Sequence, residues 1–297
     1  MLDIIIKYSI IIPHHNSSSM LSRMLHSIPE RENIQIIIID DHSDTSEIES
    51  LKKLTHANME LYFLPENHGA GYARNIGLEK VLGEWTLVVD ADDVFADNAF
   101  DVFDKNLEED LELLCFCAKC FDASTGKISK YKDMSDESVR MYLKKDCKYS
   151  QNRFRYRNTV CWNKLVRTAF LKKNNIKFED CQVNNDVYYA LQVCHKAKIF
   201  KVIPDELYYY MINDNSITHK KRTIEREYLF YIQVQKRNGL YKALGLNRYP
   251  FYRPTYLYVP FLIKKKGFGG MIDFFKYLRA HRDEVLEARK SYLSILD

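Results

Sequence analysis

The chain has 297 residues, of which 46% are hydrophobic and 28% are charged, with 10 Gly and 7 Pro. This composition is typical of a globular protein with one large domain, or with a domain and an appendage, and it excludes a disordered or fibrous chain. The formal net charge is +4, but residues 219–297 contain 17 basic and 7 acidic side chains, whereas the rest contains 27 basic and 33 acidic ones.

The first 93 residues alternate between strand patterns and helix patterns. Short apolar, mostly β-branched runs predict strands at residues 9–12, 34–39, 60–64 and 85–89. Helical spacing of apolar residues predicts helices at residues 17–28, 45–54 and 71–81. This alternation predicts an α/β fold with a mostly parallel central sheet and helices on both faces.

Beyond residue 93 the patterns are less regular. We expect helices at residues 99–107, 163–174 and 187–197, and strands at residues 111–121 and 199–203. Residues 124–157 are polar, basic and poorly periodic, which predicts a flexible insertion. From about residue 219 onward the chain is basic, rich in tyrosine and predicted to be mainly helical.

Unusual polar residues follow three of the predicted strands. They are Pro13-His14-His15-Asn16, Asp40-Asp41 and Asp90-Ala91-Asp92-Asp93. In parallel α/β sheets, ligands bind beyond the carboxyl ends of the strands. A single acidic strand end is commonly a helix cap, but two of them beside an asparagine-bearing loop favour a cation site, and Asp-x-Asp oxygens suit Mg²⁺ or Mn²⁺.

A glycine-bearing loop at residues 67–75 lies between the two acidic segments and opens a predicted helix. Its backbone amides, the helix N-terminus and Arg74 are suited to contact an anion. The loop does not match the dinucleotide-binding pattern G-x-G-x-x-G, because residue 74 is arginine and no third glycine follows at the required spacing. A dehydrogenase is therefore disfavoured.

Four segments over roughly the first 100 residues resemble family 2 glycosyltransferases with the GT-A fold. These segments are Ser9-Ile10-Ile11-Ile12-Pro13 with Asn16, Ile39-Asp40-Asp41-His42-Ser43-Asp44, Asn67-x-Gly69-x₄-Arg74-Asn75-x-Gly77 and Val89-Asp90-Ala91-Asp92-Asp93. The resemblance implies a metal-dependent, inverting transfer of a hexose from a nucleotide sugar, most simply a UDP-sugar. The implied acceptor is a glycan or a lipid-linked glycan in bacterial surface polysaccharide synthesis.

The resemblance also implies roles for individual residues. The implied contacts to the nucleotide sugar are Pro13, Asn16, Asp40, Asp41, Arg74, Asp90 and Ala91. Asp92 is the implied ligand of Mn²⁺ or Mg²⁺, and His219 is a further candidate contact to the metal or the phosphates. Asp186 is the candidate general base, with Asp180 as the competing choice. The chain departs from the family at Asn185, where a second acidic residue is usual.

These assignments imply a catalytic domain over residues 1–218, with a nucleotide-binding half at 1–93 and an acceptor-side half at 94–218, followed by the helical region at 219–297. Two alternatives stay open. A nucleotidyltransferase shares the sheet and the acidic site, but normally has a glycine-rich, lysine-bearing loop after the first strand. A non-catalytic nucleotide-sugar-binding protein is suggested by the missing acid at Asn185.

The basic C-terminal region interleaves aromatic rings with cations over residues 249–279. This pattern favours an anionic membrane surface, with packing on the catalytic domain or on a second subunit of a homodimer as the alternative. We find no nucleic-acid-binding motif. The N-terminus lacks the features of a signal peptide, and no apolar stretch reaches the roughly 18–20 residues that span a bilayer. We therefore expect a cytoplasmic protein, with the inner face of the cell membrane as a candidate peripheral location.

Overall fold

The computed structural model describes residues 5–213 and 223–297. Contacts between residues divide the chain into two compact units, the first comprising residues 1–181 and 185–214, and the second 182–184 and 215–297. The predicted domain boundary at 218/219 lies outside the described residues, and it stays a prediction. The two units are described separately below.

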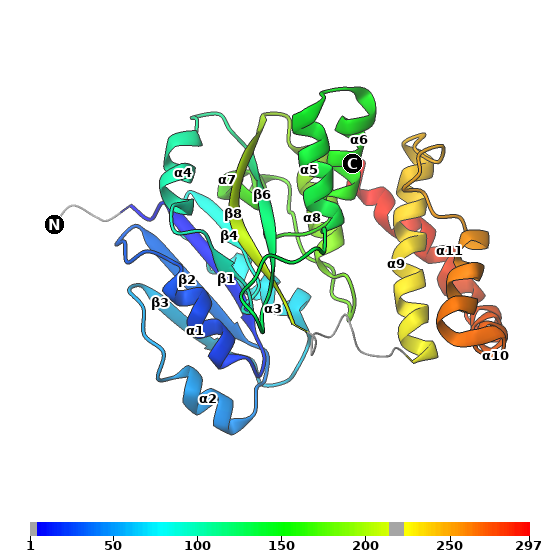
Figure 1. Cartoon of the computed structure of the whole chain (residues 1–297), viewed down its shortest axis with the longest axis horizontal. Coiled ribbons are helices and arrows are strands. Elements are labelled where there is room, and N and C mark those ends of the chain that lie inside the picture. The colour runs from blue at the N-terminus through cyan, green and yellow to red at the C-terminus, as the bar shows by residue number, and fades with distance from the viewer. Residues whose placement is uncertain (1–4, 214–222) are drawn as a thin grey trace. The chain divides into compact units, whose positions relative to one another are not determined.

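An eight-stranded sheet with the order β3-β2-β1-β4-β7-β6-β8-β5 forms the centre of the first unit (Figure 1). Its strands are β1 (Tyr8–His14), β2 (Ile34–Asp40), β3 (Met59–Phe63), β4 (Trp85–Val88), β5 (Val94–Phe95), β6 (Leu113–Asp122), β7 (Lys164–Arg167) and β8 (Phe200–Ile212). The strands β1 to β4 pair in parallel, as predicted. β7 runs antiparallel to β4 and β6, and β5 antiparallel to β8, so that the complete sheet is mixed.

Helices pack against both faces of this sheet. They are α1 (Ser18–His26), α2 (Thr45–Leu51), α3 (Ala70–Glu79), α4 (Ala99–Asn106), α5 (Met134–Lys144), α6 (Lys148–Arg157), α7 (Thr168–Lys173) and α8 (Asp186–Lys196). Successive strand side chains point to opposite faces. Ile10 and Ile12 of β1 therefore join one apolar cluster with α1, α2 and α4. Ile11 joins the other cluster, with α3 and α5 to α8. The predicted α/β architecture is confirmed.

Three predictions beyond residue 93 are wrong. Residues 124–157 are not a flexible insertion, because they contain α5 and α6. The hydrophobic pattern concealed these helices because each buries few large apolar side chains, with Val139 in α5 and Phe154 in α6 as the main ones. The helix predicted from residue 163 begins at Thr168, after strand β7. β8 extends to Ile212, well past the predicted end, and β5 was not predicted.

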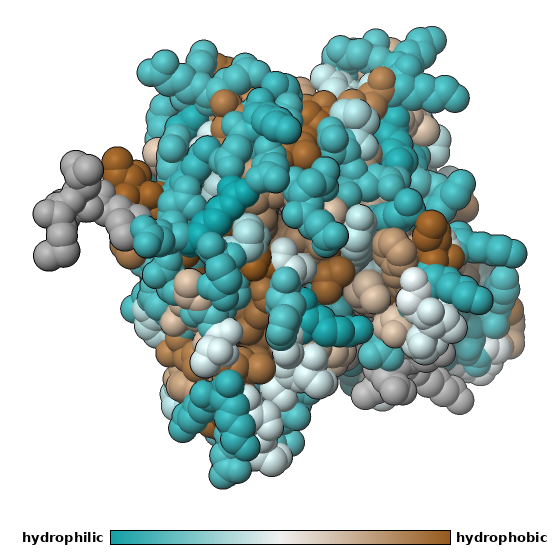
Figure 2. Space-filling view, turned by 60° about the vertical axis from the view of Figure 1, so that its left-hand side comes forward, coloured by the Kyte–Doolittle hydropathy of each residue, from teal (hydrophilic) through white to brown (hydrophobic). Residues whose placement is uncertain are grey.

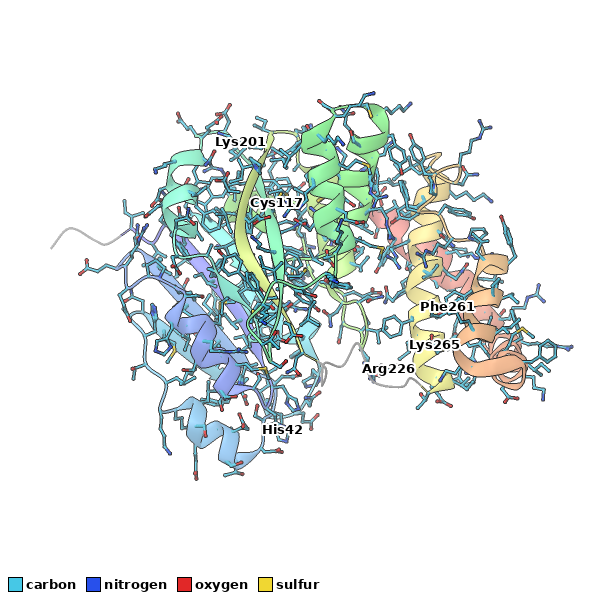
Figure 3. All side chains as sticks on the ribbon, viewed as in Figure 1. His42, Cys117, Lys201, Arg226, Phe261 and Lys265 are labelled. Carbon is cyan, nitrogen blue, oxygen red and sulfur yellow. The ribbon has the colours of Figure 1, made fainter. Side chains whose placement is uncertain are left out.

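The second unit is helical, as predicted. Its elements are α9 (Ile224–Ala243), the short 3-10 helix Thr255–Leu257, α10 (Tyr258–Ala280), α11 (Arg282–Ser291) and the 3-10 helix Tyr292–Ile295. A small core of aromatic and aliphatic side chains includes Tyr231 and Phe274. The carboxylate of Glu227 on α9 is completely buried, and Lys265 of α10 (labelled in Figure 3) neutralises it through an ion pair of 2.5 Å. α10 is kinked at Gly267, whose φ of 74° favours glycine.

The face of the molecule in Figure 2 is largely hydrophilic, with hydrophobic residues in small groups between the polar ones. Within residues 5–213 and 223–297, none of the helices combines the length and the apolar character that crossing a membrane requires.

Candidate functional site

The carboxyl ends of three parallel strands meet at one edge of the sheet, as the sequence predicts. In the strand register, His14 of β1 lies opposite Asp40 of β2. On the other side of β1, Ile11 lies opposite Val88 of β4. The polar segments that follow these strands therefore emerge side by side, and they form the candidate site.

Asp40 is buried and fully engaged by neighbouring groups. Its Oδ1 lies 2.7 Å from Nδ1 of His14 and accepts a hydrogen bond from Oγ of Ser43 at 2.5 Å. Its Oδ2 accepts the backbone N–H of Ser43 at 3.0 Å. Burial alone would raise the pKa of Asp40, but the hydrogen bonds from Ser43 and His14 outweigh it and lower the pKa. Asp40 thus fixes the loop after β2, and its contact to the nucleoside stays a prediction.

Asp41 holds the glycine-bearing loop in place. Its two carboxylate oxygens accept the backbone N–H groups of His68 and Gly69 at 2.8 and 2.7 Å. The amide of Asn67 donates to the backbone oxygen of Asp41 at 3.0 Å. Gly69 has a φ of 90°, which the turn into α3 requires. Two of the loop amides that we expected to face an anion are therefore engaged with Asp41.

Asn16 ties the loop after β1 to the loop after β2. Its φ of 48° is left-handed, a conformation that asparagine tolerates better than most residues. Its side chain accepts from the N–H of Asp44 at 2.8 Å and donates to the Asp44 carboxylate at 3.1 Å. Pro13 lies within β1, opposite Ile39. The predicted nucleotide contacts Pro13 and Asn16 thus stand beside Asp40 and Asp41.

Arg74 connects the end of β4 to the start of α8. The side chain is almost completely buried, and it donates from Nη2 to Oδ1 of Asp90 and from Nη1 to Oδ1 of Asn185, both at 2.5 Å. Its Nε is buried without a hydrogen-bond partner in the described part of the chain. The guanidinium also lies 5.4 Å from the centre of the Phe178 ring. Arg74 therefore fixes the positions of Asp90 and Asn185, which are far apart in the sequence.

Asp186 is the first residue of α8 and lies in the field of this same cluster. Burial raises its pKa, the charge of Arg74 opposes this rise and the charge of Asp90 adds to it, and the resulting pKa is about 6. A partly buried carboxyl with a pKa near 6 is suited to general base catalysis near neutral pH. The competing candidate Asp180 is exposed and lines a pocket of about 550 Å³ with Tyr72 and Asn75.

The three carboxylates after β4 occupy different environments. Asp90 is partly exposed and paired with Arg74. Burial, together with the charge of Asp90, raises the pKa of Asp92 to about 6. Asp93 is completely buried, and burial with the charges of Asp92 and Asp90 raises its pKa well above the ordinary range. Its Oδ1 accepts the N–H of Met211 at 2.8 Å, which ties this turn to β8.

These carboxylates fit a divalent cation in chemical terms. Asp92 makes no ion pair with a described residue. Its pKa is raised first by burial and then by the negative charge of Asp90, and a bound cation would relieve this repulsion. Within the described residues, no three His, Cys, Asp or Glu side chains are grouped to hold a metal by themselves. Mg²⁺ and Mn²⁺ commonly take several ligands from substrate phosphates and water, so a few carboxylates suffice. His219 lies outside the described residues, and its role stays a prediction.

Sequence reasoning missed two residues that organise this site. The hydroxyl of Tyr208 accepts the N–H of Asp90 at 3.1 Å, and its ring stacks on Trp162 with centroids 5.0 Å apart. The run of tyrosines at 208–210 was a weak signal for this role. The second residue is Asn185. In the sequence it stands out only as a departure from the family pattern, whereas in the structure its Oδ1 accepts a hydrogen bond from Arg74. Ala91 is buried.

Residues 9–172, more than half of the chain, match glycosyl transferase family 2. The chain belongs to this family. The matched residues include all four motif segments between Ser9 and Asp93. It places the chain among glycosyltransferases and confirms the resemblance that the sequence segments carry.

Relatives and solved structures agree with this family. The poly(ribitol-phosphate) beta-N-acetylglucosaminyltransferase TarS of Staphylococcus aureus is 26% identical over 212 residues, which cover 69% of this chain and 35% of TarS. This family 2 chain thus spans about a third of the length of that relative. An uncharacterized glycosyltransferase of Escherichia coli, YibD, is 26% identical over 235 residues, covering 73% of this chain and 64% of YibD.

Among solved structures, residues 1–349 of TarS in complex with UDP-GlcNAc align with a TM-score of 0.60 and 19% identity, covering 96% of this chain and 90% of that one. The mannosyltransferase PcManGT of Pyrobaculum calidifontis, in complex with GDP-Man and Mn²⁺, aligns with a TM-score of 0.54 and 12% identity, covering 97% of this chain and 74% of that one. At these identities the likeness concerns the fold, and the predicted GT-A fold is confirmed.

Proposed function

We propose that the protein is a metal-dependent, inverting glycosyltransferase that moves a hexose from a UDP-sugar to a hydroxyl group of a glycan or lipid-linked acceptor. The observation that carries this proposal is the cluster in which Arg74 joins Asp90 to Asn185, with Asp186 beside it. The proximity of Asp90 to Asp186, whose raised pKa suits a base, supports the assignment of donor binding and catalysis to this cluster. The TarS structures that contain UDP and UDP-GlcNAc support a uridine donor.

In the proposed reaction, Asp186 accepts the proton of the acceptor hydroxyl. The acceptor oxygen forms a bond to the anomeric carbon of the sugar, and the bond from that carbon to the diphosphate oxygen breaks, so that UDP leaves. Attack from the side opposite the leaving group inverts the configuration at this carbon. Arg74 positions Asp90 toward the donor and, through Asn185, fixes the first turn of α8 that carries Asp186.

Asp92, with Asp90 beside it, would hold the Mn²⁺ or Mg²⁺. When bound, this ion supplies Lewis acidity that stabilises the negative charge on the departing diphosphate. Pro13, Asn16, Asp40 and Asp41 would shape the nucleoside pocket, because their loops are tied together at the adjacent strand ends.

A donor screen tests this proposal. Thermal unfolding is measured with Mn²⁺ and each of UDP-Glc, UDP-Gal, UDP-GlcNAc, UDP-GalNAc and GDP-Man. We expect stabilisation by at least one UDP-sugar, because a ligand that binds the native state raises the unfolding temperature. Stabilisation without any UDP release would favour the non-catalytic binding protein. In a separate assay, release of pyrophosphate from UTP and a sugar 1-phosphate would favour the nucleotidyltransferase.

We also propose an anionic membrane surface as a partner of the second unit, in keeping with a lipid-linked acceptor and a peripheral location on the cytoplasmic face. Support comes from exposed apolar side chains beside cations. Tyr256 is 71% exposed and Phe268 is 66% exposed, and the run Lys264-Lys265-Lys266 lies between them in the sequence. Rings and lysines in this mixture suit the headgroup region of a bilayer. A homodimer stays a prediction.

A further inference from the structure

The second unit contains a pocket of about 660 Å³ that has no part in the proposed transfer reaction. It lies between α9, the segment at residues 252–254, and α11 with the chain that follows it. Its lining includes Gln235, Asn238, Lys242, Tyr252, Arg289 and Leu293. The volume is in the range of small-molecule sites, which is roughly 300–1,000 Å³.

Specific contacts hold the walls of this pocket in place. A Cβ atom at Gly239 of α9 would lie 1.8 Å from the backbone oxygen of Arg289 on α11, so the two helices approach this closely only because residue 239 is glycine. Asn238 donates from Nδ2 to the backbone oxygen of Arg253 at 2.7 Å and accepts the Arg253 N–H at 3.2 Å. The 252–254 segment is therefore attached to α9, and the pocket is built into the fold.

One polar side chain in the pocket wall is buried, and its amide N–H group has no hydrogen-bond partner in the described part of the chain. Gln235 is 2% exposed, and its Oε1 accepts from Nε of Arg289 at 3.0 Å. This contact fixes the orientation of the amide, because the flipped amide would set two donors against each other. The Nε2 group is then left without a hydrogen-bond partner in the described part of the chain. A buried unpaired donor is costly, and a ligand that brings an acceptor into the pocket removes that cost.

The charged groups of the lining are both cations. Lys242 and Arg289 line the pocket with their side chains exposed to solvent, and no acidic residue lines it. Because Gln235 engages Nε of Arg289, it orients the remainder of the guanidinium. The N–H donors and positive charges of this pocket favour an anion with several acceptor oxygens. A phosphoryl group is such an anion, because its oxygens can accept hydrogen bonds from both the guanidinium and the ammonium group. Pro254 and Leu293 offer apolar surface to the organic part of such a ligand.

We propose that this pocket binds a small organic phosphate, with Lys242 and Arg289 contacting the phosphoryl oxygens and Gln235 orienting Arg289. The ligand would be a phosphate ester with a compact apolar or partly apolar body. The inference does not rest on the glycosyltransferase proposal, because every residue of the pocket belongs to the second unit.

Isothermal titration of the 297-residue chain with phenyl phosphate tests the site, in the presence of excess UDP so that the strand-end site does not contribute. Inorganic phosphate and phenol are the comparison probes. We expect phenyl phosphate to bind more tightly than inorganic phosphate, and phenol not to bind. Lys242→Ala should weaken binding about tenfold, in line with the loss of one charge-assisted hydrogen bond.

Gln235→Glu gives the sharper result. The glutamate has nearly the same shape and keeps a partner for Arg289, so the unit should still fold, but its negative charge should abolish phenyl phosphate binding. Lys290→Ala is the matched control, because Lys290 is exposed on α11, pairs with Glu287 and does not line this pocket. No binding by the wild-type protein would overturn the proposal. Binding that Gln235→Glu and Lys242→Ala leave unchanged, or that excess UDP abolishes, would also overturn it.

Discussion

At the scale of single residues, carboxylates of the same type have different roles because their neighbours differ. The carboxylates of Asp40 and Asp41 accept hydrogen bonds from neighbouring N–H groups, and these bonds fix the conformation of the adjacent loops. Asp93 is completely buried and accepts one backbone hydrogen bond, from the N–H of Met211. Asp186 stands partly buried at the start of α8 in the field of Arg74 and Asp90. Asp92 has a similar pKa of about 6, but its proposed role is to hold the cation, which leaves Asp186 as the carboxylate suited to proton transfer near neutral pH.

The pKa of Asp186 predicts the acidic limb of the pH–rate profile. A base works in its deprotonated form, so raising the pKa from 3.8 to about 6 moves the loss of activity to higher pH. We expect kcat to fall as the pH decreases through about 6, when it is measured at saturating donor and Mn²⁺ between pH 4.5 and 8. A rate that stays constant down to pH 4.5 would contradict a base with a raised pKa.

Asp93 gives a prediction about stability. Replacing it with leucine leaves the partly buried N–H of Met211 without its acceptor, which costs about 1–3 kcal/mol of unfolding free energy. Asp93→Asn keeps an acceptor oxygen and should cost less. Urea unfolding of the two variants measures the difference, and equal stability of Asp93→Leu and the wild type would refute the structural role given to this residue.

At the scale of elements, helix α3 and the segment before α8 depend on each other through a glycine. A Cβ atom at Gly71 would lie 2.3 Å from the backbone oxygen of Glu179 and 2.9 Å from Cβ of Asn185. The first turn of α3 therefore contacts the chain that carries Asn185 and Asp186. This approach allows Arg74, one turn later on α3, to reach Asn185.

Gly71→Ala should consequently reduce both activity and stability, because the backbone of the Glu179–Asn185 segment must shift to accommodate the methyl group. Gly269→Ala is the matched control: it is also helical, and nothing lies within 4 Å of its added Cβ. We expect the control to be neutral or stabilised by up to about 1 kcal/mol. Initial rates of UDP release and melting temperatures measure both effects, and a Gly71→Ala protein with wild-type values of both would exclude the coupling.

The elements that could be predicted from the sequence are those whose pattern is local. The apolar runs of β1, β2 and β4 predict buried strands. The polar and acidic residues that follow these runs predict the edge of the sheet where ligands bind. β5 is a two-residue strand that exists only by pairing with β8, more than 100 residues away. The bond from Arg74 to Asn185 likewise spans 111 positions, so the partners of the site carboxylates were not readable from spacing.

At the scale of the whole molecule, an acidic first unit is joined in sequence to a basic, aromatic second unit, and this asymmetry predicts membrane binding. We expect the wild-type protein to co-sediment with vesicles that contain phosphatidylglycerol, and much less with neutral ones, because lysines attract anionic headgroups. Tyr256→Ser combined with Phe268→Ser should weaken binding several-fold. Leu82→Ser, at a residue of the first unit that is 72% exposed, is the control. Equal sedimentation with both kinds of vesicle would contradict the proposal.

The central claim is that Asp186 is the base of a glycosyl transfer from a UDP-sugar, and UDP release in the presence of Mn²⁺ measures it most directly. The sugar donor that stabilises the protein most is incubated with the wild type, with Asp186→Asn and with Asp180→Asn. Removal of a general base commonly costs about 10²–10⁴ in rate. The account predicts a loss of this size in Asp186→Asn with UDP binding unchanged, and near wild-type turnover in Asp180→Asn. Wild-type turnover in Asp186→Asn, or the reverse order of the two variants, would contradict it.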